Sequence, residues 1–523
     1  MPRAKYKPLS FSTTLRNPNR IAAFLKCLQE VENQVLTNEV AIAVAKELIK
    51  NRFYWTRYEK ATPEYLEIYN NEDETFTDEQ LNDIIENTVQ DHKEVGFDAG
   101  WPSRFDTWYK LPMEFGYCYY AMNEPIQISP LGHMLIDAIS DEEINEEQIQ
   151  NVLLHSMMKY QTNNPFRKNL NDNVPLILLL QVIQMLHNNF ENSKGIFRQE
   201  LSFFICWPNS NAQELYDEII SFREQHHFGE YTDEIVYDKC LEILNAGPND
   251  RNYYKMEKIT GEAIDEYIRK MRSTGILSLR GNGRFIDFNT LETNKINYVL
   301  EHYSVYPQFQ SKEDYFTYMG TADTEILQLQ RTVEVTVEDD IRKQALRRYA
   351  EQYEPETILI ELQKVCNRRE SSDTMLRVIA APARFEFLAS VALVQHFDGL
   401  DVCPNYHIDD EGLPTSTASG GVADIVCSTN NVIESLVEVT LMMGRQQVNN
   451  EMLPISRHLS ETKTNYPNAF SIFVAPGIHD DARRYARFIY NDEQLLVKTY
   501  GVNEFMDVIN NYSSIRELAT PSW

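Results

Sequence analysis

The chain has 523 residues, 43% of them hydrophobic, and its 49 Lys and Arg against 78 Asp and Glu give a formal net charge of −29. This length suffices for two to four domains with ordinary apolar cores. The longest apolar run, 174–186, contains two Gln and falls short of the roughly 20 residues that span a bilayer, so we expect no membrane anchor. The first residues, MPRAKYKPLSFS, are basic without an apolar segment behind them, and we expect a cytoplasmic protein.

Cysteine and histidine are scattered along the chain. The seven cysteines stand singly, which argues against a disulfide framework and a zinc ribbon, and we expect reduced, mostly buried thiols. The eleven histidines include no HExxH motif, so a metal site built mainly from imidazole is not expected. Any metal ion should therefore be held by oxygen atoms.

The acidic balance disfavours nucleic-acid binding by the surface as a whole, because phosphate contacts require Lys and Arg. The charge is uneven, however. Residues 1–58 hold ten Lys and Arg against four Asp and Glu, whereas 64–98 and 137–147 are strongly acidic. Local fields decide which surface meets a polyanion, so a nucleic-acid substrate is compatible with this sequence. Solvated helix faces explain any single basic cluster at least as well.

Residues 1–150 predict a small helical module with a hairpin. Helical periodicity covers 78–95, and a second helix is expected at 101–115. Two short strands then bracket Asn123-Glu124, and Pro130 opens a closing helix. The order helix, helix, hairpin, helix is typical of a winged helix, and we interpret this part as a first winged-helix-like module.

The same order of elements recurs before residue 303. The segment GEAIDEYIRKMRSTG has apolar residues at helical spacing and ends at Gly275, which predicts an amphipathic helix. Further helices are expected at 175–187, 197–205 and 212–225. We therefore interpret 151–303 as a subdomain with a second winged-helix-like module, and 304–337 as a connector.

The hairpin of this second module is the most specific local signal in the N-terminal part. In ILSLRGNGRFIDFN, the dipeptide Asn282-Gly283 supplies the positive φ angles that a tight turn needs. Arg280 and Arg284 flank this turn and would stand at the tip of a wing, where they could reach a groove or a phosphate. An ordinary solvated hairpin is an equally good interpretation.

From residue 338 to 523 the pattern predicts an α/β domain. A helical stretch covers 338–366, and ARFEFLASVALVQHF predicts a buried helix that is apolar on nearly every side yet contains Glu386. A lone buried carboxylate is costly unless it has a partner. The apolar segment 469–475 predicts a buried strand, followed by a helix at 480–490.

Two acids lie inside the β-branched runs of GGVADIVCSTNNVIESLVEVT, 420–440. A turn centred on Asn431 would place Asp424 and Glu438 opposite each other on one face, with Cβ atoms about 4.5 to 5.5 Å apart. Two like charges this close are destabilising unless a cation lies between them, and Mg²⁺ favours one or two carboxylates with waters and phosphate oxygens. On the hairpin alone, acids of an edge strand that face water are the simpler interpretation.

The next segment, MGRQQVNNEMLPISRHLSE, places Glu451 and His458 about two helical turns apart and so on one face. Pro454 requires either that the helix starts near it, with Glu451 at the cap, or that the helix is kinked. A helix with Glu, a hairpin with Asp and Glu, and a polar helix together resemble the PD-(D/E)xK nuclease core. Ala423 and Thr440 depart from that motif, where Pro and Lys are usual.

The chain resembles the AlwI family of type II restriction endonucleases over most of its length. The matching blocks are SFSTTLRNPNRIAAFLKCL, GIFRQELSFFI, FEFLASVAL, GGVADIVC, LVEVTL and NEMLPISRHL. This resemblance implies a multidomain α+β protein, with an N-terminal helical, winged-helix-type recognition region and a C-terminal α/β PD-(D/E)xK nuclease domain. It also implies Mg²⁺-dependent cutting of double-stranded DNA at a fixed distance outside a short asymmetric site, as in type IIS enzymes of restriction-modification systems.

The resemblance also implies roles for site residues. Asp424 and Glu438 correspond to cation ligands, Glu386 to a direct or water-mediated ligand, and Glu451 to a second-site ligand or general base. His458 matches the family's trailing histidine, which we expect to orient water or contact phosphate. Because the family shares the VEVT sequence, the missing lysine does not by itself indicate an inactive enzyme.

For DNA binding, Arg16, Arg20, Arg280 and Arg284 are the expected contacts, because Arg suits both guanine edges and phosphates. The family includes enzymes that cut both strands and enzymes that mainly nick one. One catalytic centre per chain means that a double-strand break requires a second copy or a partner subunit.

Two interpretations from other functional classes compete with this one. A non-catalytic winged-helix DNA-binding regulator would explain the N-terminal modules and leave the C-terminal acids as structure. A glycosidase would need two carboxylates roughly 5 to 9.5 Å apart in a cleft lined by aromatics. The sequence near Asp424 and Glu438 has no Trp, which disfavours the glycosidase.

Overall fold

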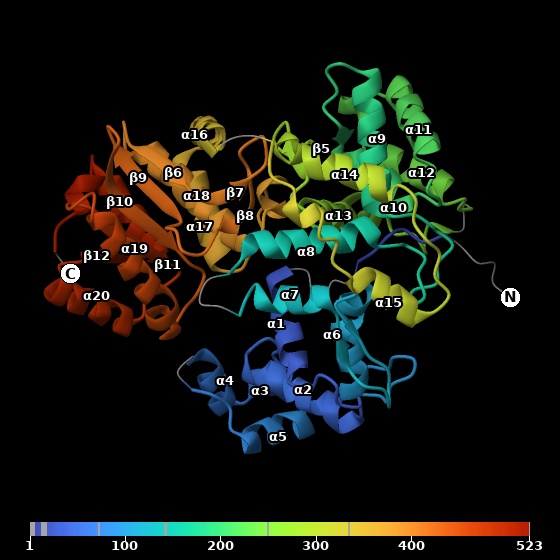
Figure 1. Cartoon of the computed structure of the whole chain (residues 1–523), viewed down its shortest axis with the longest axis horizontal. Helices are drawn as coiled ribbons and strands as arrows, with labels where there is room; N and C mark the ends of the chain where they lie inside the picture. Colours follow the sequence, from blue (N-terminus) through green and yellow to red (C-terminus); the bar gives the residue numbers. More distant parts are fainter. Residues whose placement is uncertain are drawn as a thin grey trace. The chain divides into compact units, whose positions relative to one another are not determined.

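Figure 1 shows the computed structural model of the chain, which describes residues 6–11, 18–71, 74–140, 144–247, 250–332 and 335–521. The chain forms two compact units, each built from segments that are distant in sequence. The first unit comprises residues 1–55, 81–139 and 148–332, and the second comprises 56–80, 140–147 and 333–523. Among the described residues, no helix is both long enough and apolar enough to cross a membrane.

The helix, helix, hairpin, helix order predicted for the first 150 residues is present, with a shorter first helix. This part contains α1 (Pro18–Gln29), α2 (Asn38–Lys50), α3 (Arg57–Ala61), α4 (Pro63–Asn70), α5 (Asp78–Asn87), α6 (Trp101–Glu114), β1 (Cys118–Tyr119), β2 (Gln127–Ile128), α7 (Pro130–Asp137) and α8 (Glu146–Lys159). The helix expected at 78–95 ends at Asn87. Val89 and Val95 are 80% and 97% exposed, so the remainder has no apolar face to bury.

The helices and the hairpin predicted before residue 303 are also present, and the hairpin has a third strand that was not predicted. Its elements are α9 (Pro175–Asn189), β3 (Ile196–Phe197), α10 (Leu201–Cys206), α11 (Ala212–Gln225), α12 (Asp233–Ile243), α13 (Ala263–Arg272), β4 (Leu277–Arg280), β5 (Phe285–Phe288) and α14 (Thr293–Tyr303). Strand β3 pairs with β5, so the helix expected at 197–205 begins only at Leu201. Gly195 precedes β3 with a φ of +83°, and a Cβ there would lie 2.2 Å from the Ile286 carbonyl oxygen.

Residues 304–332 pack within the first unit. Tyr298 and Tyr303 donate hydrogen bonds to the Asp323 carboxylate, with shortest distances of 3.0 and 2.6 Å. Helix α15 (Lys312–Gly320) approaches Gly116, where an added Cβ would lie only 2.3 Å from Met319 Cβ. Most of the segment that the sequence suggests as a connector is therefore fixed to the first unit.

The second unit contains a five-stranded mixed sheet in the order β12-β11-β10-β9-β6. The strands are β6 (Asp401–Pro404), β9 (Ile425–Thr429), β10 (Val432–Val439), β11 (Phe470–Ala475) and β12 (Val497–Gly501), and β7 (Tyr406–Ile408) pairs separately with β8 (Pro414–Ala418). Strands β10, β11 and β12 are parallel, β9 pairs antiparallel with β10, and β6 pairs antiparallel with β9.

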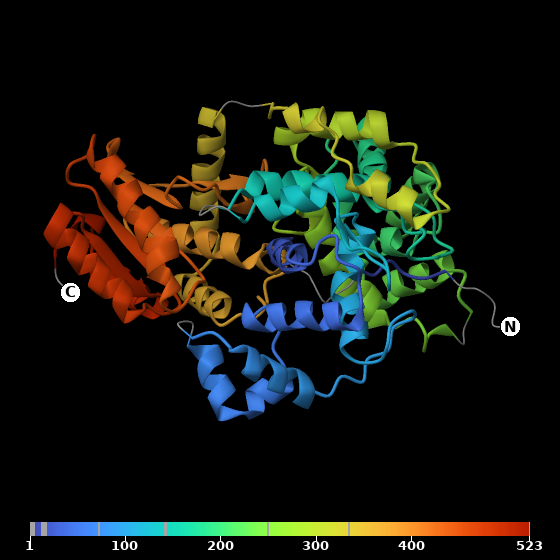
Figure 2. The same ribbon diagram turned by 60° about the horizontal axis from the view of Figure 1, so that its bottom comes forward.

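Helices cover this sheet in both views of the second unit (Figures 1 and 2). They are α16 (Val335–Gln352), α17 (Pro355–Cys366), α18 (Ala381–His396), α19 (Leu453–Lys463), α20 (Asp480–Glu493) and α21 (Val502–Asn511). Phe473 and Val497 of the sheet pack with Ile455 and Leu459 of α19 and Ala486 of α20 in one buried apolar cluster. The helix expected at 338–366 is interrupted at Pro355, because proline cannot continue the hydrogen-bond ladder of the preceding helix.

All seven cysteines are free, and five of them are buried, as the sequence predicts.

Candidate active site

The hairpin β9–β10 brings Asp424 and Glu438 together by a different route from the predicted one. Asn430 and Asn431 both have positive φ, 50° and 63°, and the turn is centred between them, with Thr429 opposite Val432. A β-bulge between Ile433 and Ser435 then inserts one residue, which restores the register that a turn centred on Asn431 would give. Beyond the bulge Val437 faces Ile425, so the next positions along the pair are Glu438 and Asp424.

Crossed hydrogen bonds hold these two acids at the beginning of β9. The Asp424 backbone N–H donates to Glu438 Oε2 at 3.2 Å, and the Val439 backbone N–H donates to Asp424 Oδ2 at 2.7 Å. Each carboxylate thus accepts a backbone N–H from the opposite segment, which fixes its position. The prediction that the two acids are cross-strand neighbours is confirmed.

His458 contacts Glu438 directly. Its Nδ1 lies 3.0 Å from Glu438 Oε1 and donates a hydrogen bond to that carboxylate, and both side chains are largely buried. The histidine stands on α19, which packs against the sheet face that carries Glu438. In the described structure His458 therefore orients a carboxylate, a contact that the sequence did not predict.

Glu386 reaches the acid cluster from the middle of α18 and is only 4% exposed. Its Oε2 accepts a hydrogen bond from the Ala418 backbone N–H at 3.1 Å. Burial raises the pKa of this carboxyl well above its ordinary range, and the negative charges of Glu146 and Glu438 raise it further. In the absence of a cation, this environment favours the neutral form of Glu386 over its charged form.

Glu146 is a further acid close to this site, and the sequence did not predict its position there. It begins α8, is 7% exposed, and belongs to the segment 140–147 that joins the second unit. In the sequence it lies in an acidic run, 137–147, which is typical of a solvated surface. Only the tertiary structure shows that one acid of this run is buried and acts on the pKa of Glu386.

Asp424 has a pKa raised well above its ordinary range. Burial is the main cause, followed by the charges of Glu386 and Glu438, and the hydrogen bond from Val439 only partly offsets them. Four acids, Glu386, Asp424, Glu438 and Glu451, thus act on one another electrostatically. Such mutual perturbation is typical of functional sites.

Glu451 lies in a π-helical turn, Val448–Met452, directly before α19. The helix begins at Leu453, next to Pro454, which agrees with the prediction that the helix starts near this proline and is not kinked by it. Glu451 lies in the preceding π-turn and is not a cap residue. Burial raises the pKa of Glu451 to about 7, opposed by a hydrogen bond from Thr440. Thr440, which stands where the PD-(D/E)xK motif has lysine, therefore contacts a candidate base. Isolated π-turns occur frequently at functional sites.

The donor set of this cluster is suited to a hard cation. Among the described residues, no group of three or more His, Cys, Asp or Glu side chains is placed as a complete set of metal ligands. Asp424 and Glu438 supply two adjacent carboxylates, which matches the habit of Mg²⁺ of taking one or two carboxylates and completing its shell with water and phosphate oxygens. The residues present therefore fit Mg²⁺ better than a metal that needs a full protein cage.

Family comparison decides the class of protein to which this site belongs. A family model described as AlwI restriction endonuclease matches residues 113–337 and 316–494, together most of the chain. The chain belongs to the AlwI restriction endonuclease family. It is accordingly a type II restriction endonuclease, and the resemblance stated from the sequence blocks is confirmed.

Two restriction endonucleases of known structure are similar to this AlwI-family chain. The small subunit (R.BspD6I2) of the heterodimeric restriction endonuclease R.BspD6I is 25% identical over 29% of this chain and 75% of its own, with a TM-score of 0.24. The restriction endonuclease FokI is 12% identical over 98% of this chain and 97% of its own, with a TM-score of 0.25. No curated protein sequence matches the chain.

The four arginines expected to contact DNA in this AlwI-family protein have different environments. Arg16 lies outside the described residues. Arg20 donates to the Phe53 carbonyl oxygen at 2.7 Å and lies over the Phe24 ring. Arg280 does not stand free at the wing tip, because its Nε donates to buried Asp287 at 2.8 Å, and Asp287 is also bound by His187. Its role as a DNA contact stays a prediction.

Arg284 is exposed beside the turn, and its Nε donates to the Gly281 carbonyl oxygen at 2.9 Å. Of the two wing arginines it is the one whose surroundings match the predicted position.

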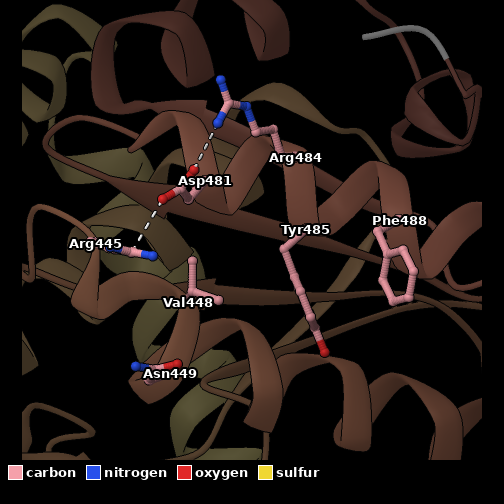
Figure 3. Close-up of a pocket in the computed structure, with 7 residues that line it drawn as sticks. All are labelled: Arg445, Val448, Asn449, Asp481, Arg484, Tyr485 and Phe488. Atoms are coloured by element: carbon pink, nitrogen blue, oxygen red, sulfur yellow. Dashed lines mark hydrogen bonds and ion pairs between the residues drawn. The ribbon is translucent and has the colours of Figure 1, made fainter.

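A separate cavity of about 470 Å³ lies beside the π-turn of Glu451 (Figure 3). Arg445 and Arg484 line this cavity, and both form ion pairs with Asp481, at 3.3 and 3.1 Å. Phe488 lines the cavity and is 60% exposed. The Asp481 carboxylate therefore offsets part of the positive charge of these two arginines.

Proposed function

We propose that this AlwI-family enzyme is a Mg²⁺-dependent, site-specific endonuclease of the PD-(D/E)xK type. It cuts double-stranded DNA at a fixed distance outside a short asymmetric sequence, as part of a restriction-modification system. Residues 338–523 are the cleavage domain, and 1–150 and 151–303 are the recognition subdomains in this proposal. The observation that carries it is the pair Asp424 and Glu438, held on one face by crossed hydrogen bonds.

The proposed site divides the chemistry among these acids. Asp424 and Glu438 hold Mg²⁺, with Glu386 as a direct or water-mediated ligand. The bound cation polarises the scissile phosphate and makes water a better nucleophile. His458 keeps Glu438 oriented through the 3.0 Å hydrogen bond, as second-layer donors do for metal-bound carboxylates.

Glu451 is the proposed general base. A base works best when its pKa lies near the operating pH, and burial raises the pKa of Glu451 to about 7. The Thr440 hydroxyl hydrogen bonds to this carboxylate, which favours its charged form. Glu451 can therefore accept a proton from the attacking water at neutral pH and release it to solvent afterwards.

Digestion of a mixed plasmid and phage DNA pool tests this function. With Mg²⁺ we expect discrete fragments, and with EDTA none. Sequencing of the ends should find a common short asymmetric sequence at a constant offset. A non-catalytic winged-helix regulator would instead bind DNA and leave it intact in both conditions.

Each chain offers one set of these acids, so a double-strand break requires a second copy or a partner subunit. If the chain is a strand-specific nicking subunit, supercoiled plasmid will convert to open circles without linear product. Linear product that depends on the square of the enzyme concentration indicates two copies.

Replacing His458 with Ala tests its orienting role. We expect cleavage to fall about 10- to 100-fold, and half-maximal activity to need more Mg²⁺, because Glu438 loses the donor that fixes it. The measurement is the cleavage rate as a function of Mg²⁺ concentration. His458→Asn retains an amide donor and should recover part of the rate, whereas unchanged Mg²⁺ dependence in His458→Ala would exclude an orienting role.

A further inference from the structure

A second cavity, of about 580 Å³, lies in the first unit between the N-terminal segment and the turn that precedes α13. Three lysines, Lys7, Lys255 and Lys258, line it and are exposed. We call these three residues the lysine cluster. Tyr253, 59% exposed, stands beside them on the same rim. Neither the family match nor the candidate active site assigns a role to this surface.

The N-terminal side of this cavity is held in place by hydrogen bonds. The Lys7 backbone N–H donates to Asn171 Oδ1 at 2.8 Å, and the Leu9 N–H donates to the Ile205 carbonyl oxygen at 2.7 Å. The Tyr254 hydroxyl donates to the Tyr6 carbonyl oxygen at 2.7 Å. The backbone beneath Lys7 is therefore fixed opposite the other two lysines.

The opposite side of the cavity has unusual helical geometry. Lys258 begins a π-helical turn, Lys258–Glu262, which runs directly into α13. A π-turn is less stable than regular helix and is found frequently where a side chain has a function. The turn Val448–Met452, which carries Glu451, has the same geometry.

The charge of the lysine cluster is not neutralised. The chain has 78 acids and 49 bases, so most exposed cations are expected to find a carboxylate. No ammonium group of the lysine cluster forms an ion pair with a described residue. Of the two carboxylates that line the cavity, Glu266 is bound by Arg269 at 2.6 Å, and Glu262 is exposed. This differs from the cavity of Figure 3, where Asp481 forms ion pairs with both arginines and offsets part of their charge.

We propose that the lysine cluster binds phosphates of the DNA backbone and holds the duplex against the second recognition module. The inference rests on the proposed function, because that function supplies DNA as the polyanion. Exposed Tyr253 adds a hydroxyl group to the same rim, and Tyr hydroxyls are among the donors that contact phosphate and sugar oxygens of duplex DNA. Phosphate contacts carry no sequence information, so the cluster contributes affinity and register, not specificity.

The test compares the variant K7Q/K255Q/K258Q with the control K50Q/K93Q/K194Q. The control removes three exposed lysines of the same unit elsewhere, so both variants have the same net charge. Dissociation constants for a fluorescent duplex are measured in EDTA over a series of KCl concentrations. Each lost phosphate contact should reduce the slope of log K against log salt by about 0.9, so we expect a reduction of about 2 to 3 for the cluster variant.

The control should keep the wild-type slope, and at about 0.1 M salt the cluster variant should bind about tenfold or more weakly to specific and non-specific DNA alike. Single variants such as K258Q should each show about one third of the change, so the result does not depend on the triple variant folding. If wild-type protein binds and cuts DNA but both triple variants share its slope, the inference on the lysine cluster fails alone. If wild-type protein neither binds nor cuts DNA, the proposed function fails.

Discussion

Replacing Asp424 with Asn is expected to reduce DNA cleavage by about 10³-fold or more, while DNA binding in EDTA stays within about twofold of wild type. An Asn oxygen can still accept the hydrogen bond from the Val439 N–H that Asp424 Oδ2 accepts at 2.7 Å, so the hairpin should keep its structure. What is lost is the negative charge that faces a cation beside Glu438. The measurement is the single-turnover cleavage rate in Mg²⁺, compared with the dissociation constant of the same duplex.

Two further variants serve as comparisons for Asp424→Asn. Asp424→Ala also removes the acceptor for Val439 and should be equally inactive. Asp480→Asn, at an exposed acid on the first turn of α20, removes the same charge from the same unit and should cut at close to the wild-type rate. An Asp424→Asn variant that still cuts at a rate comparable to Asp480→Asn would remove the site assignment and leave the acids as structure.

The meeting of Asp424 and Glu438 could be predicted from local chemistry. Acids inside two β-branched runs joined by Asn-Asn require a partner on the same face, and strand periodicity selects which acids share it. The bulge at Glu434 could not be predicted, because it depends on how the backbones of β9 and β10 pair, and the local sequence does not indicate this. The predicted register is right because the off-centre turn and the bulge cancel.

Long-range packing explains what the sequence did not show. The contact of Glu386 with the Ala418 backbone requires the pair β7–β8, whose strands were not predicted. The burial of Glu146 requires a segment of the N-terminal half to join the second unit. The ion pair of Arg280 with Asp287 depends on a residue seven positions away, across a hairpin whose side-chain partners a sequence pattern does not specify.

Without a divalent cation, the second unit should lose stability as the pH rises from about 5 to 8. The pKa of Glu451 is raised to about 7, and those of Glu386 and Asp424 are raised well above their ordinary range. The folded state therefore keeps protons that the unfolded state has already released, and the free energy of unfolding falls as the pH passes from the unfolded pKa to the folded pKa. For the site as a whole we expect a loss of about 2 to 4 kcal/mol, or about 5 to 10 °C in the unfolding temperature in EDTA.

Mg²⁺ should reverse this loss at pH 8 and have less effect at pH 5, where protons compete for the same oxygens. Other buried acids, including Glu59, Asp106 and Glu114, also have raised pKa values, so the pH dependence of wild-type stability does not by itself report on the site.

The difference in unfolding temperature between wild type and Asp424→Asn isolates the contribution of the site. The variant removes one charge from the cluster, so in EDTA it should be more stable than wild type at pH 8 and nearly equal at pH 5. Its unfolding temperature should also be insensitive to Mg²⁺. If the Asp424→Asn variant is less stable than wild type at pH 8 and is still stabilised by Mg²⁺, Asp424 is neither part of the repulsive acid cluster nor a ligand of the cation.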